Sequence, residues 1–336
     1  MSETLPRFKV VLTDPSWPDL RCEEELLSSI ADLHRFNCQT EEELILNCSD
    51  ADALLVTYAP ITRKVIGALK KCRVISVYAI GSDMVDVQAA TEAGIPVTNV
   101  PGYCVEEVCD HAMTLLLAAA RKVLFLHQSV QEGQWKWQLA KPIYRLRGKT
   151  LGLIGFGKIP RAVAVRAMSF GLRVMTFDPY VTVADCDKAG VAKAELDDLL
   201  QQADFVSIHA PLTPETKGLM NMDRFRVMKR TAVIINTSRG PVVEEKALVK
   251  ALEEGWIAGA ALDVLDVEPP KHNPFIHMKN VILTPHAGFY SEEAVEELRA
   301  TAALEVKRVL TGQHPDHLVN PDVSRYIKGI SNVREC

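Results

Sequence analysis

Residues 150–178 read TLGLIGFGKIPRAVAVRAMSFGLRVMTFD, and this stretch decides the fold of the chain. The apolar run Thr150–Ile154 predicts a buried strand, and a glycine turn and a helical pattern follow it directly. Gly155 permits the tight turn, and Gly157 leaves room for a phosphate group to approach the backbone at the helix start. A strand, a glycine turn and a helix in this order are typical of the Rossmann dinucleotide-binding unit.

The stretch departs from the full fingerprint at one position, because Pro160 stands where a third glycine is usual. Proline is tolerated in a first helical turn, but the shortened glycine pattern alone also fits an ordinary turn. Asp178 strengthens the prediction, since it ends the next strand about 20 residues after Gly155. A carboxylate there can bind both ribose hydroxyls of NAD and repel the 2′-phosphate of NADP. The alternative is a turn residue before Pro179.

On both sides of this stretch, short apolar runs alternate with amphipathic helical patterns. Further strands are expected at Phe8–Leu12, Ala53–Thr57, Val74–Val77, Val97–Asn99, Arg173–Phe177, Phe205–Ile208, Ala232–Asn236, Ala258–Leu262 and Val281–Leu283. Helices are expected at Glu23–Leu33, Arg161–Phe170, Glu195–Gln202, Glu244–Glu254 and Ser291–Leu310. Apolar strands that alternate with helices predict an α/β fold, with parallel sheets covered on both faces.

The order of these elements predicts two domains. A long helical pattern from Cys104 to Val123 carries the chain out of the first strand series, and the pattern Ser291–Leu310 can return it. We therefore expect a discontinuous, flavodoxin-like substrate-binding domain (1–103 and 292–336). An NAD-binding Rossmann domain with a doubly wound parallel sheet (104–291) would be inserted into it.

Composition excludes several classes of protein. The 336 residues are 48% hydrophobic and 24% charged with a net charge of −5, and no basic block marks a nucleic-acid partner. No signal-peptide pattern and no apolar run of about 20 residues occurs, so neither export nor a membrane partner is expected. Eight cysteines without a CxxC pair predict reduced thiols, a cytoplasmic location and no metal site.

The segment Phe125–Arg147 carries Trp135 and Trp137 between polar residues. One interpretation is a loop whose indoles cover core surface. The other is an arm that docks on a second subunit, because exposed aromatic side chains favour interfaces. With the arm, a homodimer is expected.

Polar groups of complementary charge follow three of the later strands: Arg239, Glu268 and His286. Carboxyl ends of parallel strands line the ligand crevice of such sheets. A guanidinium can hold the carboxylate of a 2-keto acid and polarise its ketone, and a histidine beside a carboxylate can supply the proton. Each residue alone could also be an ordinary turn or loop residue.

The chain resembles the D-isomer-specific 2-hydroxyacid dehydrogenases, through LGLIGFGKI, HAPLTPETKGLMN, VIINTSRGPVVEEKALVKALEEGWIAGAALDVLDVEP and NVILTPHAGFYSEEA. Two stretches, TPHAGFYSEEA and TGQHPDHLVNP, look most like the branch of this family that contains the C-terminal-binding proteins and the phosphoglycerate dehydrogenase-like proteins. The resemblance implies an NAD-dependent D-2-hydroxyacid dehydrogenase, or 2-keto acid reductase, with catalytic Arg239, Glu268 and His286. It also implies cofactor contacts from Gly155, Gly157, Lys158, Ile159, Asp178, His209, Pro211, Thr216, Thr237, Asp263 and Gly288. Asp110 and His111 lie in the helical pattern Cys104–Val123, and we expect them to serve packing and capping rather than chemistry.

The family's substrate loop aligns with residues 77–86, where Val77 replaces the usual arginine. Backbone amides near Ile80 and Gly81 could still bind a carboxylate, and Tyr78 could add an aromatic wall and a hydroxyl. The lost cation argues against a phosphorylated substrate. Two alternatives stay open: an NAD(H)-sensing, corepressor-like binding protein with weak dehydrogenase activity, and a formate or phosphite dehydrogenase of the same fold.

Overall fold

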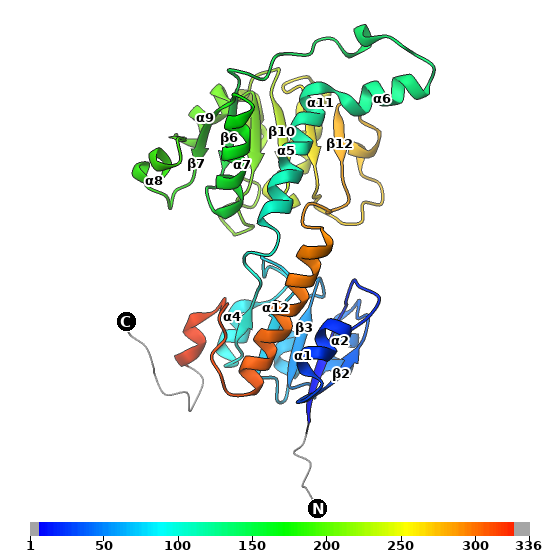
Figure 1. Cartoon of the computed structure of the whole chain (residues 1–336), viewed down its shortest axis with the longest axis vertical. Helices are drawn as coiled ribbons and strands as arrows, with labels where there is room; N and C mark the ends of the chain where they lie inside the picture. The colour runs from blue at the N-terminus through cyan, green and yellow to red at the C-terminus, as the bar shows by residue number, and fades with distance from the viewer. Residues whose placement is uncertain (1–6, 326–336) are drawn as a thin grey trace, which may run out of the picture. The chain divides into compact units, whose positions relative to one another are not determined.

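The computed structural model describes residues 7–325 and divides the chain into two compact units (Figure 1). The large unit is Cys104–Ser291, and the small unit combines Met1–Tyr103 with Glu292–Cys336. The ends of the small unit, 1–6 and 326–336, lie outside the described residues, and Cys336 lies there too. The chain thus enters the large unit once and leaves it once.

The large unit contains a parallel sheet of seven strands in the order β12-β11-β10-β9-β6-β7-β8. The strands are β6 (Thr150–Ile154), β7 (Arg173–Phe177), β8 (Ala192–Lys193), β9 (Phe205–Ile208), β10 (Val233–Asn236), β11 (Gly259–Leu262) and β12 (Val281–Leu283). The order of the strands reverses between β6 and β9, which is the doubly wound Rossmann arrangement. The predicted α/β fold is therefore confirmed.

Helices cover both faces of this sheet. One face packs on α5 (Val105–Arg121), α7 (Lys158–Ser169) and α8 (Val183–Lys188), and the other on α9 (Leu196–Gln202), α10 (Met222–Val227) and α11 (Glu245–Glu253). The strands read as continuous apolar runs because both faces are buried. Gly152 in β6 leaves room for Leu199 of α9, which an added Cβ would meet at 2.4 Å.

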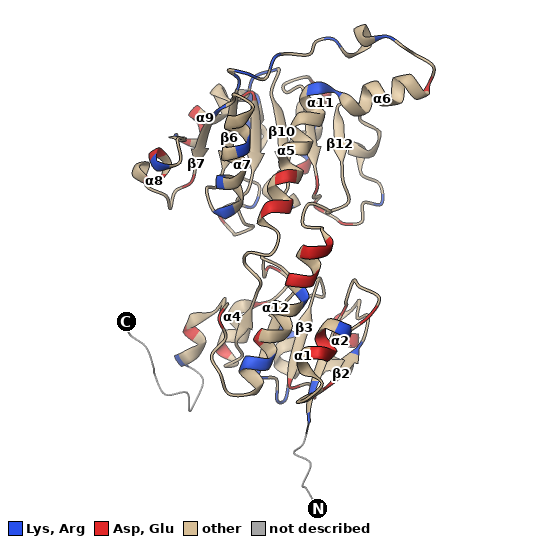
Figure 2. Ribbon diagram, in the orientation of Figure 1, with Lys and Arg blue, Asp and Glu red and all other residues tan. Residues whose placement is uncertain are grey.

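The small unit contains a five-stranded parallel sheet in the flavodoxin-like order β2-β1-β3-β4-β5. Its strands are β1 (Phe8–Leu12), β2 (Ala31–Arg35), β3 (Ala53–Val56), β4 (Val74–Val77) and β5 (Val97–Thr98). Its helices are α1 (Arg21–Leu27), α2 (Glu41–Cys48), α3 (Arg63–Ala68), α4 (Val87–Glu92) and the returning α12 (Glu292–Leu310). Helix α12 lies beside α1 and covers the central strands β3 and β4 (Figure 1). Its first turn is acidic, as is that of α5, which suits the positive end of a helix dipole (Figure 2).

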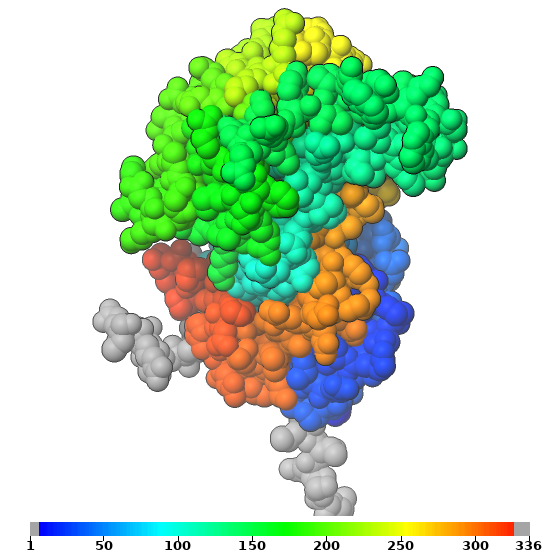
Figure 3. Space-filling view, turned by 45° about the horizontal axis from the view of Figure 1, so that its top comes forward, coloured from blue at the N-terminus to red at the C-terminus, as the bar shows by residue number. Residues whose placement is uncertain are grey.

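One expectation about secondary structure is wrong, and one of the two interpretations of the segment Phe125–Arg147 needs correction. The helix expected over Glu23–Leu33 ends at Leu27, and β2 begins at Ala31, in register with β1. The segment Phe125–Arg147 is not a plain loop, because α6 (Val123–Gln131) and a short 3-10 helix (Trp137–Ala140) occupy much of it. This segment forms a lobe at the surface of the large unit (Figure 3). Within residues 7–325, every helix is too short or too polar to cross a membrane.

Candidate active site

The three candidate catalytic residues follow the neighbouring strands β10, β11 and β12 in the large unit. All three strands are parallel, so their carboxyl ends lie along one edge of the sheet. Arg239 lies in the loop after β10, Glu268 in the loop after β11, and His286 in the turn after β12. The fold therefore gathers these loops at the edge where ligands bind in doubly wound sheets.

Glu268 and His286 form a direct pair. The imidazole Nδ1 lies 2.7 Å from Glu268 Oε2, and the side chains are 29% and 34% exposed, respectively. The second carboxylate oxygen accepts the amide of Leu265 at 2.8 Å. Partial burial alone would raise the pKa of Glu268, but the bonds from His286 and Leu265 outweigh it and lower that pKa. Glu268 therefore binds the imidazole of His286 at Nδ1 and fixes the orientation of the ring.

The turn that carries His286 has an unusual backbone. His286 has φ +53°, in the left-handed region that side chains seldom adopt. The carbonyl of Asp263 accepts its amide at 2.9 Å. The Asp263 carboxylate accepts the next two amides, from Ala287 at 2.9 Å and Gly288 at 2.8 Å. Asp263 thus accepts three successive backbone amides and fixes the conformation of the turn.

The loop of Arg239 packs directly on the loop of Glu268. An added Cβ at Gly240 would lie 2.0 Å from the carbonyl carbon of Leu265, so only glycine fits there. Asn236 braces the loop: its Nδ2 donates to the carbonyl of Arg239 at 2.9 Å, and its Oδ1 accepts the amide of Ser238 at 3.0 Å. The backbone of Arg239 is thereby fixed beside the loop that supplies Glu268.

The glycine turn and Asp178 lie together at the carboxyl ends of β6 and β7. Gly155 has φ +95°, and an added Cβ would meet the backbone of His209 and Ala210 at 3.1 Å. Gly157 precedes α7, and open space surrounds its Cα. The two oxygens of Asp178 accept the amides of Phe156 and Tyr180, each at 2.8 Å. Each oxygen keeps a further lone pair that ribose hydroxyls can use.

Other expected cofactor residues surround this edge. Lys158 and Ile159 form the first turn of α7, with buried Pro160 next to them. Pro211 and Thr216 close a turn after β9, where the Thr216 hydroxyl donates to the Pro211 carbonyl. The hydroxyl of Thr237 is buried and has no hydrogen-bond partner within residues 7–325. A dinucleotide bound at this edge of the sheet would give this hydroxyl a partner.

His209 lies at the carboxyl end of β9, with Nε2 2.8 Å from the Ser207 hydroxyl. Loss of solvation lowers its pKa to about 3. The ring is therefore neutral near pH 7 and suits packing rather than proton transfer.

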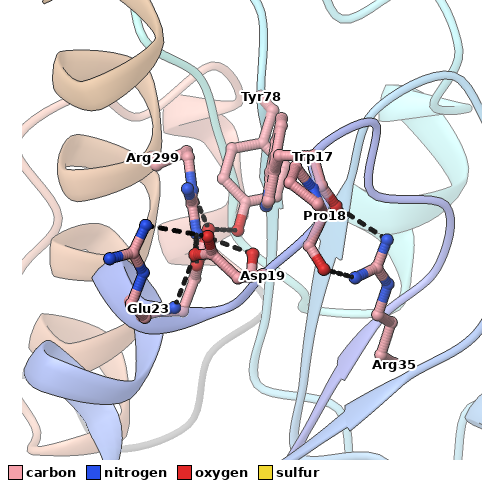
Figure 4. Close-up of polar contacts among 8 residues, drawn as sticks. Trp17, Pro18, Asp19, Glu23, Arg35, Tyr78 and Arg299 are labelled. Carbon is pink, nitrogen blue, oxygen red and sulfur yellow. Dashed lines mark hydrogen bonds and ion pairs between the residues drawn. The ribbon is translucent and has the colours of Figure 1, made fainter.

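The structure places Tyr78 differently from the expected wall of a substrate site. Its side chain is 3% exposed, and its hydroxyl donates to Glu23 Oε1 at 3.0 Å (Figure 4). Arg299 binds the same carboxylate, and the Trp17 ring packs edge-on against Tyr78 with centroids 4.5 Å apart. Burial, and then the neighbouring charge of Glu23, raise the pKa of Tyr78. The Tyr78 hydroxyl therefore has a buried partner within the small unit, and we do not propose it as a substrate-binding group.

Hydrogen bonds to backbone carbonyls hold the loop that contains Ile80 and Gly81. The carbonyl of Ile80 accepts Asn99 Nδ2 at 2.6 Å, and the carbonyl of Ala79 accepts the amide of Val100 at 2.9 Å. Within residues 7–325, the amides of Ile80 and Gly81 themselves make no hydrogen bond. The carbonyls of this loop are therefore hydrogen-bonded, while the amides of Ile80 and Gly81 can still donate to a ligand.

Sequence reasoning missed some residues that shape the site. Gly240 was passed over, although glycine beside a polar strand end signals a close backbone approach. Thr284 was also overlooked, and His111 was assigned to packing, yet both bind Asp263. Their pairing spans 173 residues of chain, and no local pattern reports such a contact.

Residues 113–288 match the family described as D-isomer specific 2-hydroxyacid dehydrogenase, NAD binding domain. The glyoxylate reductase of Korarchaeum cryptofilum (strain OPF8) is 43% identical to this chain over 84% of the chain and 87% of that protein. The solved glyoxylate reductase from Paecilomyes thermophila has a TM-score of 0.86 and 29% identity, and the match covers 94% of this chain and 99% of the other. The D-lactate dehydrogenase from Aquifex aeolicus, complexed with NAD and lactic acid, has a TM-score of 0.83 and 26% identity, over 90% and 96%.

Proposed function

The chain belongs to the D-isomer specific 2-hydroxyacid dehydrogenase family, and we propose that Arg239, Glu268 and His286 are its catalytic groups. It is an NAD-dependent oxidoreductase that transfers a hydride between NAD(H) and a small 2-hydroxy or 2-keto acid. The relatives support this enzyme and not the corepressor-like binding protein considered as the alternative. The observation that carries the proposed roles is the 2.7 Å pair of His286 and Glu268 at the carboxyl edge of the sheet.

NAD supplies or accepts the hydride when it is bound. During reduction, Arg239 binds the carboxylate of the keto acid and polarises its carbonyl through the planar guanidinium. Protonated His286 donates a proton from Nε2 to the carbonyl oxygen and recovers one from solvent. Glu268, held ionised by its lowered pKa, stabilises the imidazolium through Nδ1. During oxidation, neutral His286 accepts the hydroxyl proton at the same atom.

The cofactor-binding residues are proposed on the geometry of the glycine turn and its neighbours. The amides at the start of α7, with Lys158 and Ile159, hold the pyrophosphate, and Asp178 binds the ribose. Thr237 donates its unused hydroxyl to the cofactor. Gly155, Gly157 and Gly288 allow close backbone approach, while His209, Pro211, Thr216 and Asp263 shape the rest of the surface.

For the small unit, which we propose as the substrate-binding domain, the amides of Ile80 and Gly81 supply a carboxylate site. Buried Val77 stands where the family usually has an arginine, so the loop offers no charge for a phosphate. We propose glyoxylate, or a keto acid nearly as small, as the preferred substrate, in line with the names of the relatives.

A panel of 2-keto acids, followed by NADH absorbance with NADPH alongside, tests this function. We expect the highest kcat/KM with a small, unphosphorylated acid and NADH. His286→Gln should lose most of kcat while NADH still binds. A preference for a phosphorylated acid would contradict the substrate assignment, and wild-type turnover by His286→Gln would contradict the catalytic one.

We propose a homodimer formed through the segment 123–147, which we call the arm. Its apolar side chains are exposed, with Trp135 at 86% and Trp137 at 67%. A cavity of about 940 Å³ lies between the arm and the amino ends of β9 to β12. A second copy that brings the same surface would cover both features. Light scattering should report a dimer that Leu124→Glu weakens, and a monomeric wild-type protein would refute this.

The remaining partners and the location follow from charge and thiols. We propose that the enzyme binds no nucleic acid, because its net charge is −5 and its basic and acidic residues interleave (Figure 2). The seven cysteines among the described residues are free thiols, which supports the reducing cytoplasm as its location.

A further inference from the structure

His111, on α5, lies against the turn that carries His286. Its Nε2 is 2.9 Å from the Thr284 hydroxyl oxygen and 3.2 Å from Asp263 Oδ1. The Thr284 hydroxyl is 2.6 Å from the same carboxylate oxygen. A carboxylate only accepts, so the hydroxyl donates to Asp263 and its oxygen accepts from His111. This pattern places the ring hydrogen of His111 on Nε2.

Asp263 connects this pair to the catalytic turn. Its side chain is 2% exposed, and both oxygens accept backbone amides of the turn, from Ala287 and Gly288. Burial alone would raise its pKa, but the bonds from His111, Thr284 and the two amides lower it. The buried carboxylate is therefore ionised: it accepts from Thr284 and the two amides, and His111 Nε2 contacts it at 3.2 Å.

The turn needs such support because His286 has a left-handed backbone. Residues with a Cβ hold that conformation only where the surroundings fix it. The ring of His111 also contacts the turn directly: an added Cβ at Gly288 would lie 3.3 Å from His111 Cδ2 and 2.8 Å from Asp263 Oδ2. The imidazole direction of His286 thus depends on these groups as well as on Glu268, which binds the ring itself.

We propose that His111 and Thr284 are positioning residues: they fix the Asp263 carboxylate, which holds the turn 286–288 and so aims the His286 imidazole at the substrate. This inference rests on the proposed catalytic role of His286. It replaces the expectation that His111 serves packing and capping, and it gives Thr284 a role.

Amide hydrogen exchange of the cofactor-free protein tests the support itself. In His111→Phe the ring shape stays but the donor is lost, and we expect exchange at Ala287 and Gly288 to quicken about tenfold, as for one lost bond to a charged group. His111→Gln keeps a donor at the same reach and should restore protection. Thr284→Val and Thr284→Ser form a second matched pair, in which valine loosens the turn and serine does not.

Steady-state kinetics then tests the link to catalysis. In His111→Phe, kcat should fall about tenfold to a hundredfold, as expected for a misplaced proton donor. The KM of the keto acid should change less than about threefold, because its contacts remain. Leu116→Ala is the control: it weakens the packing of α5 elsewhere and should leave kcat and the exchange of Ala287 and Gly288 unchanged.

Three results would overturn the proposal. They are unchanged exchange at Ala287 and Gly288 in His111→Phe, an equal effect of Leu116→Ala, and a loss that falls on NADH affinity instead of kcat. Failure of the proposed function looks different: the wild type would reduce no 2-keto acid, or His286→Gln would stay fully active. The exchange measurement on the cofactor-free protein would still decide whether His111 and Thr284 hold the turn.

Discussion

Glu268→Gln measures how much the carboxylate contributes to proton transfer. The bond from Glu268 to His286 Nδ1 is 2.7 Å long, and both side chains are about two-thirds buried. A hydrogen bond to a charged group contributes about 1.5–3 kcal/mol and a neutral one about 0.5–1.5 kcal/mol. Glutamine keeps the length and shape of the side chain and loses the charge, so transition-state stabilisation should fall by about 1–2 kcal/mol. This corresponds to a loss in kcat of about fivefold to thirtyfold.

The assay is NADH oxidation at saturating keto acid, repeated in the His286→Gln background. Glu268 acts through the imidazole, so its substitution should change kcat less than about twofold once His286 is gone. Unfolding temperatures of the four proteins serve as the control for misfolding. If Glu268→Gln lowers kcat by the same factor in both backgrounds, the carboxylate acts independently of His286 and the pairing argument fails.

The other predictions concern cofactor choice, stability and pH. Asp178→Ala should raise the ratio of kcat/KM with NADPH to that with NADH, because the carboxylate no longer repels the 2′-phosphate; an unchanged ratio would reject the ribose assignment. Glu23→Ala should lower the free energy of unfolding by about 3–5 kcal/mol, measured in urea, because Arg299 loses its fully buried partner; a loss below about 1 kcal/mol would contradict this. Asp204 accepts the amide of Thr150, and its bonds to that amide and to nearby lysines outweigh burial and lower its pKa. The stability it contributes is therefore present above the ordinary carboxyl range near pH 4 and is lost as the pH falls through the lowered value. Asp204→Asn should flatten that part of the curve of stability against pH, and parallel curves for the two proteins would count against the assignment.

Strands β6 and β7 could be predicted to the residue because they are apolar runs that the fold buries. Thr150–Ile154 and Arg173–Phe177 are the observed bounds of β6 and β7, and β6 is buried along its whole length. The edge strand Ala31–Arg35 escaped prediction because most of its side chains are exposed or half-buried. Because the strand has no continuous buried face, its residues show no alternation of apolar and polar side chains that would separate it from the end of the preceding helix.

The candidate site divides in the same way. Strand ends are readable from sequence, so the loops of Arg239, Glu268 and His286 could be expected at one edge. Which side chain each loop turns inward depends on partners far along the chain. Tyr78 points toward Glu23 because that buried carboxylate needs donors, and the other donor, Arg299, is 276 residues from Glu23. No local spacing encodes that arrangement.

The discontinuous small unit has a consequence for synthesis on the ribosome. The large unit is one continuous segment, Cys104–Ser291, and can fold as soon as it has emerged. The small unit cannot be completed until its C-terminal part is synthesised. Ser76 in β4 donates to the carbonyl of Ala302 in α12, and the side-chain oxygen Oδ1 of Asn320 accepts the amide of Val97. Until α12 is made, one face of the first sheet has no cover over β3 and β4. We therefore expect the large unit to fold before the small unit, and the incomplete five-stranded sheet to be the part of the nascent chain that binds chaperones.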